Sequence, residues 1–143
     1  MNTPVSFEIA KLLKEKGFDE DCYRTYNNYN GQISPFPLLE NMGGEPILNP
    51  LDYKWRNSLI HESVVSAPTI AEVVMWLYEK CGIWISVYTM ETWPNGNERK
   101  QLFDYSLKQM RFGLIDISKK PEEFNSPTEA YSQAIEYTLK NLI

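Results

Sequence analysis

The chain has 143 residues, of which 43% are hydrophobic and 23% charged, and its formal net charge is −5. This composition is that of an ordinary folded domain and excludes a disordered segment. The acidic balance argues against a role built on binding phosphate groups, and no stretch approaches the about 18 apolar residues of a membrane span. We therefore expect a single domain over residues 1–143 that contacts no membrane.

A short helix is predicted near the N-terminus, between Ser6 and Gly17. The Ser6 hydroxyl can cap the first turn, and Gly17 suits the left-handed conformation that ends many helices. Phe18 would then fold back on the last turn. The apolar residues recur at helical spacing and form one stripe: Ile9, Ala10, Leu12 and Leu13.

A hairpin is predicted next. Residues 22–29 are rich in tyrosine, which favours strands, and they lead into Asn30-Gly31, a strong signal for a tight turn. A weak return strand follows at residues 32–34. Both faces of the first strand would carry tyrosine rings, some of them exposed: Tyr23, Tyr26 and Tyr29.

The segment Pro35–Ser58 shows neither helical nor strand periodicity. It is interrupted by prolines and glycines, namely Pro35, Pro37, Gly43, Gly44, Pro46 and Pro50. A loop of this length, at about residues 35–58, is uncommon in a compact domain and is often functional. We predict that it is a recognition loop appended to the fold.

A helix over about Pro68–Lys80 is strongly indicated. Thr69 and Glu72 have the spacing of a capping box, and Gly82 lies just beyond the end. Apolar residues cover most of its circumference, which predicts a helix sandwiched in the fold or presented to a partner. The core stripe is Ile70, Val73, Val74 and Leu77, and Met75, Trp76 and Tyr78 extend it.

Two strands are expected over Ile83–Thr92 and Lys100–Gln109, joined by a hairpin turn at Pro94–Asn97. Alternation in the first strand separates Ile83, Ile85 and Val87 on one face from Trp84, Tyr88 and Met90 on the other. We expect both faces to be at least partly covered. A further strand is predicted at Phe112–Ile117.

The last predicted helix starts at Ser126 and reaches the C-terminus. Ser126 supplies an N-cap, Pro127 suits the first helical position and Glu129 completes a capping box. Together these elements predict an α+β fold, with about three helices packed on a mainly antiparallel sheet of about four strands.

Three stretches of the chain, Val5–Phe18, Ser66–Val87 and Phe124–Ile143, resemble small uncharacterised proteins of bacteriophages and prophage-like mobile elements of Bacteroides-type bacteria. The three blocks occur here in the same order as in those proteins. The resemblance implies an origin in a phage or mobile element, and it carries no activity or residue role with it.

Residues able to support catalysis or metal binding are few and dispersed. His61 is the only histidine, and Cys22 and Cys81 lie too far apart for a metal knuckle or a disulfide framework. The acidic run Asp19–Asp21 lacks the ligand spacing of a calcium loop. We expect no catalytic residue, no cofactor and no metal. Free thiols and the lack of a signal peptide predict a cytoplasmic protein.

The leading hypothesis is a non-catalytic accessory protein of a phage or mobile element that binds another protein. Its candidate partner-binding residues are aromatics in loops or turns: Tyr53, Trp55 and Trp93. A homo-oligomer is also compatible with the sequence. One alternative is a small carboxylate-based hydrolase, because 19 acidic residues make carboxylate pairs easy to form. A weaker one is a nucleic-acid-binding module using Arg99, Lys100, Lys108 and Arg111.

Overall fold

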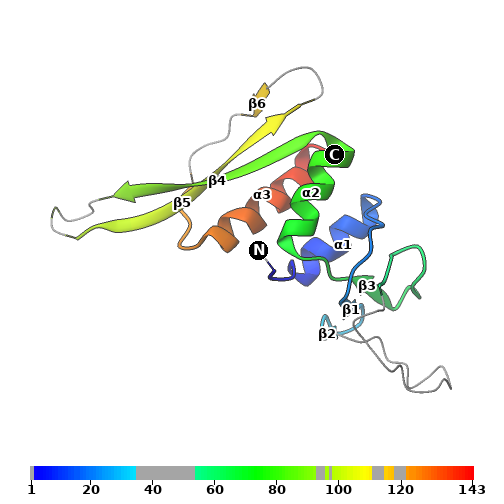
Figure 1. Ribbon diagram of the computed structural model, residues 1–143. Coiled ribbons are helices and arrows are strands. Elements are labelled where there is room, and N and C mark those ends of the chain that lie inside the picture. Colours follow the sequence, from blue (N-terminus) through cyan, green and yellow to red (C-terminus); the bar gives the residue numbers. More distant parts are fainter. Residues whose placement is uncertain (1, 35–53, 93–95, 97, 111–114, 118–121) are drawn as a thin grey trace. The chain divides into compact units, whose positions relative to one another are not determined.

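A computed structural model describes residues 2–34, 54–92, 96, 98–110, 115–117 and 122–143. These residues form three helices and six strands, and every paired strand is antiparallel (Figure 1). The predicted α+β class with three helices is confirmed, and its strands are divided between two three-stranded sheets. Backbone contacts group the chain into an N-terminal unit, Pro4–Thr69, and a C-terminal unit that begins at Ile70 and includes residues 2–3. One domain over 1–143 stays a prediction.

Helix α1 (Phe7–Glu15) begins and ends where the sequence predicts. The Ser6 hydroxyl accepts a hydrogen bond from the amide of Ile9, 3.3 Å away. At the other end Gly17 has φ +83°, and the Phe18 amide donates to the carbonyl of Leu13. The Phe18 ring is buried, so the chain does fold back on the last turn.

The sheet of the N-terminal unit has the order β2-β1-β3, with β1 at Thr25–Asn27, β2 at Ile33–Ser34 and β3 at Val64–Ser66. The predicted turn is confirmed at Gly31, which has φ +67°. A Cβ atom there would come 3.0 Å from the Phe7 ring, so a larger residue would have to displace that ring and also strain the backbone.

The core of the N-terminal unit lies between α1 and its sheet. The Tyr26 hydroxyl donates to the carbonyl of Val5 across 2.5 Å, and burial raises the pKa of this phenol. Tyr23 and Tyr29 are exposed and lie outside β1, so the strand predicted over residues 22–29 is shorter than expected. The buried apolar residues of this unit are Val5, Ile9, Ala10, Leu13, Phe18, Cys22, Tyr26, Val65 and Ala67.

The C-terminal unit consists of helices α2 (Ile70–Cys81) and α3 (Pro127–Asn141) and a sheet of order β4-β5-β6. Strands β4 (Ile83–Thr92) and β5 (Lys100–Gln109) have the predicted bounds, and β6 (Ile115–Ile117) falls within the predicted third strand. Both helices pack against the β4–β5 hairpin and against each other (Figure 1). Of the predicted turn Pro94–Asn97, only Gly96 is among the described residues.

The Ser126 half of the predicted capping box of α3 is present, whereas the Glu129 carboxylate bonds to the amide of Asn125, one residue before the cap. The Ser126 hydroxyl accepts from the Glu129 amide at 3.1 Å, and the Glu129 carboxylate accepts from the Asn125 amide at 3.1 Å. Two amides without helical partners are thereby satisfied. Below the cap, α3 buries Ala130, Ala134, Ile135, Thr138 and Leu139, which keep it on the sheet.

Ser126→Ala should lower the free energy of unfolding by about 1 kcal/mol, because the Glu129 amide loses its acceptor. Urea denaturation followed by circular dichroism measures the change. The matched control is Thr128→Ala, at an exposed position in the same helical turn. Equal midpoints for Ser126→Ala and the wild type would contradict the assignment of Ser126 as the cap.

Candidate functional site

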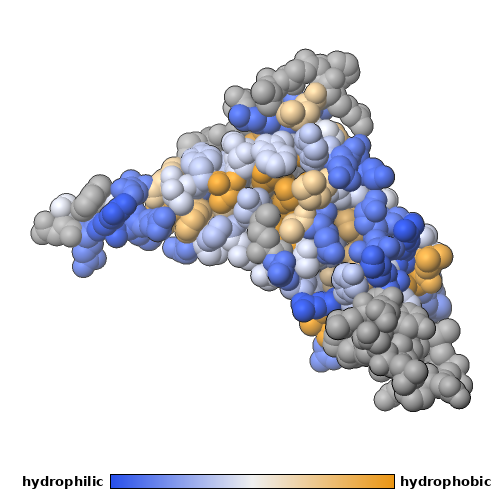
Figure 2. Space-filling model, in the orientation of Figure 1, coloured by the Kyte–Doolittle hydropathy of each residue, from blue (hydrophilic) through white to orange (hydrophobic). Residues whose placement is uncertain are grey.

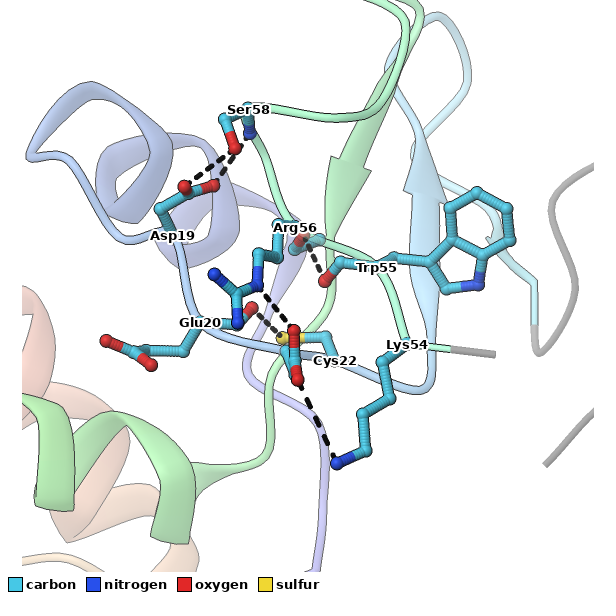
Figure 3. Close-up of polar contacts among 9 residues, drawn as sticks. Asp19, Glu20, Cys22, Lys54, Trp55, Arg56 and Ser58 are labelled. Atoms are coloured by element: carbon cyan, nitrogen blue, oxygen red, sulfur yellow. Dashed lines mark hydrogen bonds and ion pairs between the residues drawn. The ribbon is translucent and has the colours of Figure 1, made fainter. Parts of the chain in front are cut away.

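The acidic residues near the N-terminus form a turn that pairs with a distant segment. We call Asp19–Cys22 the acidic turn and Lys54–Ser58 the return segment. Cys22 and Trp55 exchange two backbone hydrogen bonds, of 2.9 and 2.7 Å, as an isolated antiparallel bridge. The Asp19 carboxylate accepts from both the amide and the hydroxyl of Ser58 at 2.7 Å (Figure 3).

The charges of the acidic turn are compensated by the return segment. The Asp21 carboxylate lies 2.6 Å from the Arg56 guanidinium and 3.8 Å from the Lys54 ammonium. The hydrogen bond from Arg56 lowers the pKa of Asp21, and that from the Ser58 side chain lowers the pKa of Asp19. The same ion pair raises the pKa of Arg56.

The lowered pKa values of Asp19 and Asp21 limit the chemistry of which the acidic turn is capable. Acid–base hydrolysis by two carboxylates needs one group with a raised pKa, so that it can donate a proton near neutral pH. Asp19 and Asp21 have lowered pKa values and remain ionised there. Their contacts instead tie the return segment to the acidic turn, which is a structural role.

Of the predicted partner-binding aromatics, Trp55 is described, whereas Tyr53 and Trp93 lie outside the described residues. Trp55 sits in the return segment, where the pairing with Cys22 fixes its backbone and its side chain is half-buried. Figure 3 shows the indole turned away from the Arg56 guanidinium. Partner binding by these three residues stays a prediction.

The two cysteines and the histidine belong to separate segments of the chain. Cys22 is a buried free thiol, and Cys81 is a half-buried one at the end of α2. The exposed His61 ring lies 2.9 Å from the Ser63 hydroxyl through Nδ1. Among the residues that the structure describes, no group of three or more His, Cys, Asp or Glu side chains could hold a metal ion.

The β4–β5 ladder separates a covered face from a second face, which we call the open face. In the register, Trp84 lies opposite Lys108, Ser86 opposite Ser106 and Tyr88 opposite Asp104. Directly opposed residues project to the same side, so these three pairs share the open face.

The covered face carries four buried residues: Ile83, Ile85, Tyr105 and Leu107. Burial raises the pKa of Tyr105 far above that of free tyrosine.

Exposure on the open face is concentrated on β4. Trp84 and Tyr88 keep 39% and 45% of their surface in solvent, whereas Asp104 and Leu102 on β5 keep 1% and 2%. The sequence predicts that both faces are at least partly covered, and the open face is covered mainly along β5. Trp84 and Tyr88 are therefore functional candidates, and a search for aromatic residues in loops and turns does not find them.

Both exposed rings are held in place by contacts within the unit. The Trp84 indole N–H donates to the Ser86 hydroxyl at 2.8 Å, and its ring meets Tyr78 of α2 edge to face, with centroids 5.5 Å apart. The Tyr88 hydroxyl donates to the Asp104 carboxylate at 2.8 Å. Further exposed apolar residues in this unit are Met75, Tyr78 and Met110.

The free end of the β4–β5 hairpin differs in character from its middle. Figure 2 shows strongly hydrophilic residues at this end and apolar residues over the middle of the hairpin. Glu91, Glu98, Arg99 and Lys100 are exposed there, and Arg99 pairs with Glu91. Of the basic residues considered for nucleic-acid binding, Lys108 is half-buried and Arg111 lies outside the described residues.

Comparisons with protein-family models, with curated proteins and with solved structures found no match to this chain. The phage-type origin therefore stays a prediction based on the sequence. No helix in the described part of the chain is long and apolar enough to cross a membrane.

Asp19→Asn should lower stability at neutral pH by up to about 1 kcal/mol, because the exposed carboxylate loses its charge-assisted bonds to Ser58. Because the hydrogen bonds from Ser58 lower the pKa of Asp19, this stability is present above the pKa of Asp19 in the unfolded chain and is lost as the pH falls through its pKa in the folded protein. The difference from the wild type should vanish in acid. Urea midpoints across pH measure it, with Glu62→Gln as a charge-matched control. A pH-independent difference would contradict this account.

Tyr88→Phe should cost about 1–3 kcal/mol, because the buried Asp104 carboxylate loses a hydrogen bond. That bond raises the pKa of Tyr88 above 10.0, so its stabilisation is present below the unfolded pKa and is lost as the pH rises through the folded one. Denaturation at neutral and alkaline pH measures both effects. Tyr78→Phe, on another exposed ring, is the control, and an equal loss in the two variants would refute the role of the Tyr88 hydroxyl.

Proposed function

We propose that this chain is a non-catalytic protein-interaction protein, an accessory protein of a phage or mobile element that acts in the bacterial cytoplasm. Its binding surface is the open face along β4. The observation that carries the proposal is the exposure of Trp84 and Tyr88 on one face of a strand, at 39% and 45%. Large aromatic rings are enriched at protein interfaces and dominate their binding energy.

The geometry of the rings supports recognition of a protein surface. The polar atom of each ring already has a partner within the chain, in Ser86 for Trp84 and in Asp104 for Tyr88. A partner therefore has to supply an apolar surface rather than new hydrogen-bond acceptors. Rings fixed before binding also lose less conformational entropy when the complex forms.

The alternatives raised by the sequence draw less support from the described residues. A hydrolase built on the acidic turn would use carboxylates whose pKa values are lowered, which suits ion pairing. A nucleic-acid surface would need unpaired basic side chains, whereas Arg99 pairs with Glu91. The formal net charge of −5 is also unfavourable for binding a polyanion.

The test places a photo-activatable benzoylphenylalanine at position 84, incubates the protein with a cytosolic extract of Bacteroides-type cells and identifies the cross-linked proteins. The matched control carries the same group at the exposed Gln133 of α3. We expect one protein other than this chain itself to be cross-linked from position 84 and not from 133. Trp84→Ala should weaken its affinity at least about tenfold, and Gln133→Ala should leave it unchanged. Equal cross-linking from both positions would overturn the proposal.

A further inference from the structure

We propose that β4 is a pairing edge, and that its occupant is β4 of a second copy of this chain. The two strands would run antiparallel across a two-fold axis and join two β4-β5-β6 sheets into one. This inference concerns the backbone edge of β4 and goes beyond the proposed function. The observations that lead to it are the position of β4 in the sheet, its sequence and its exposure.

Strand β4 lies at the edge of its sheet. The order is β4-β5-β6, and all ten residues of β4 pair with β5 on one side only. No described residue pairs with its other side. The far side of β5, by contrast, pairs with β6 and with Phe124, which exchanges two backbone hydrogen bonds with Phe103.

The hydrogen bonds of the hairpin identify which backbone groups face outward. The Met110 amide donates to the carbonyl of Gly82, so this pair is of the hydrogen-bonded kind. Such pairs alternate along an antiparallel ladder, so the even-numbered residues of β4 bond to β5. The odd-numbered residues therefore direct their N–H and C=O groups to the free edge. They are Ile83, Ile85, Val87, Thr89 and Glu91.

This edge lacks the features that usually prevent strands from pairing. Natural edge strands are often short, bulged, interrupted by proline or marked by charges, above all lysine. Over Ile83–Thr92 there is no bulge, no proline and no lysine, and the only charged residue is Glu91, near the end. A strand of this kind presents an uninterrupted template for another strand.

The exposed rings of β4 lie next to the position that an added strand would occupy. Tyr88 is 45% exposed although the residue opposite it, Asp104, is 1% exposed. A residue on an inner strand is flanked on both sides, whereas a residue on an edge strand is flanked on one side. A strand added beside β4 would therefore cover Trp84 and Tyr88 laterally while the open face itself stays accessible.

A second copy fits this edge because β4 is complementary to itself. With the axis at Ser86, Trp84 lies opposite Tyr88 of the second copy, and Ile85 opposite Val87. The odd-numbered residues then meet odd-numbered residues, so their outward groups bond to one another. Aromatic and β-branched pairs of this kind stabilise antiparallel strands. Glu91 falls beyond the paired residues, so no charge is buried.

The register with its axis at Ser86 is more favourable than the neighbouring register with its axis at Val87. An axis at Val87 would set Glu91 opposite Ile83 of the second copy and would separate Trp84 from Tyr88. The two-fold arrangement uses the β4 edge of each chain once, so the assembly closes as a dimer.

The first experiment measures mass by sedimentation equilibrium of the whole chain from about 1 to about 200 µM, a range that brackets micromolar association. We expect a concentration-dependent dimer. Ser86→Lys sets two like charges opposite each other on the axis, so it should raise the dissociation constant by about tenfold or more. The matched control is Ser106→Lys, which adds the same charge opposite Ser86 on β5 and should leave dimerisation unchanged. A monomer at all concentrations, or a dimer insensitive to Ser86→Lys, would overturn the proposal.

The second experiment tests the register by oxidation. Cα atoms of a non-hydrogen-bonded antiparallel pair are about 4.5 Å apart, within the range of a disulfide. When oxidised by air with a copper catalyst, Ser86→Cys should form a disulfide-linked dimer. Ser106→Cys and the parent chain, treated in the same way, should not. Cross-linking of Ser106→Cys to the same extent would refute the β4 edge. Because both experiments measure self-association alone, their failure leaves the proposed binding of another protein standing.

Discussion

The ten-residue register between β4 and β5 determines most of what the C-terminal unit can do. Since side chains alternate along a strand, one register assigns Ile83 and Ile85 to the covered face and Trp84 and Tyr88 to the open face. The same register decides which backbone groups bond within the hairpin and which face outward. A shift of one residue would turn Trp84 and Tyr88 toward the helices and expose Ile83 and Ile85, so the apolar contacts with α2 and α3 hold the register in place.

Features with a local cause could be predicted from the sequence. The caps of α1 and α3 follow from Ser6 and Ser126, because the capping hydroxyl lies three residues from the amide it satisfies. The bounds of β4 and β5 follow from alternation between two turn signals. Pairings between distant segments have no local signal, so β3 and the bridge between Cys22 and Trp55 were not predicted. Nor does alternation reveal that the strands divide between two sheets.

The candidate site was less predictable, for a related physical reason. In the sequence, position in a loop indicates exposure, and this criterion selects Tyr53, Trp55 and Trp93. The structure shows Trp55 half-buried with its backbone held by Cys22, and it exposes Trp84 and Tyr88 on a regular strand. Whether a strand lies at the edge or in the middle of a sheet depends on its neighbours. The exposure of its side chains therefore cannot be derived from its own residues.

The open face and the free edge of β4 make different demands on a partner. The face offers rings whose polar atoms are already satisfied by Ser86 and Asp104, so it favours an apolar surface. The edge offers backbone groups that no strand in the described part of the chain pairs with, so it favours an extended strand. Because the two lie at right angles, filling the edge leaves the rings accessible and brings Trp84 beside Tyr88 of a second copy. Self-pairing would thus enlarge the surface for another protein instead of competing with it.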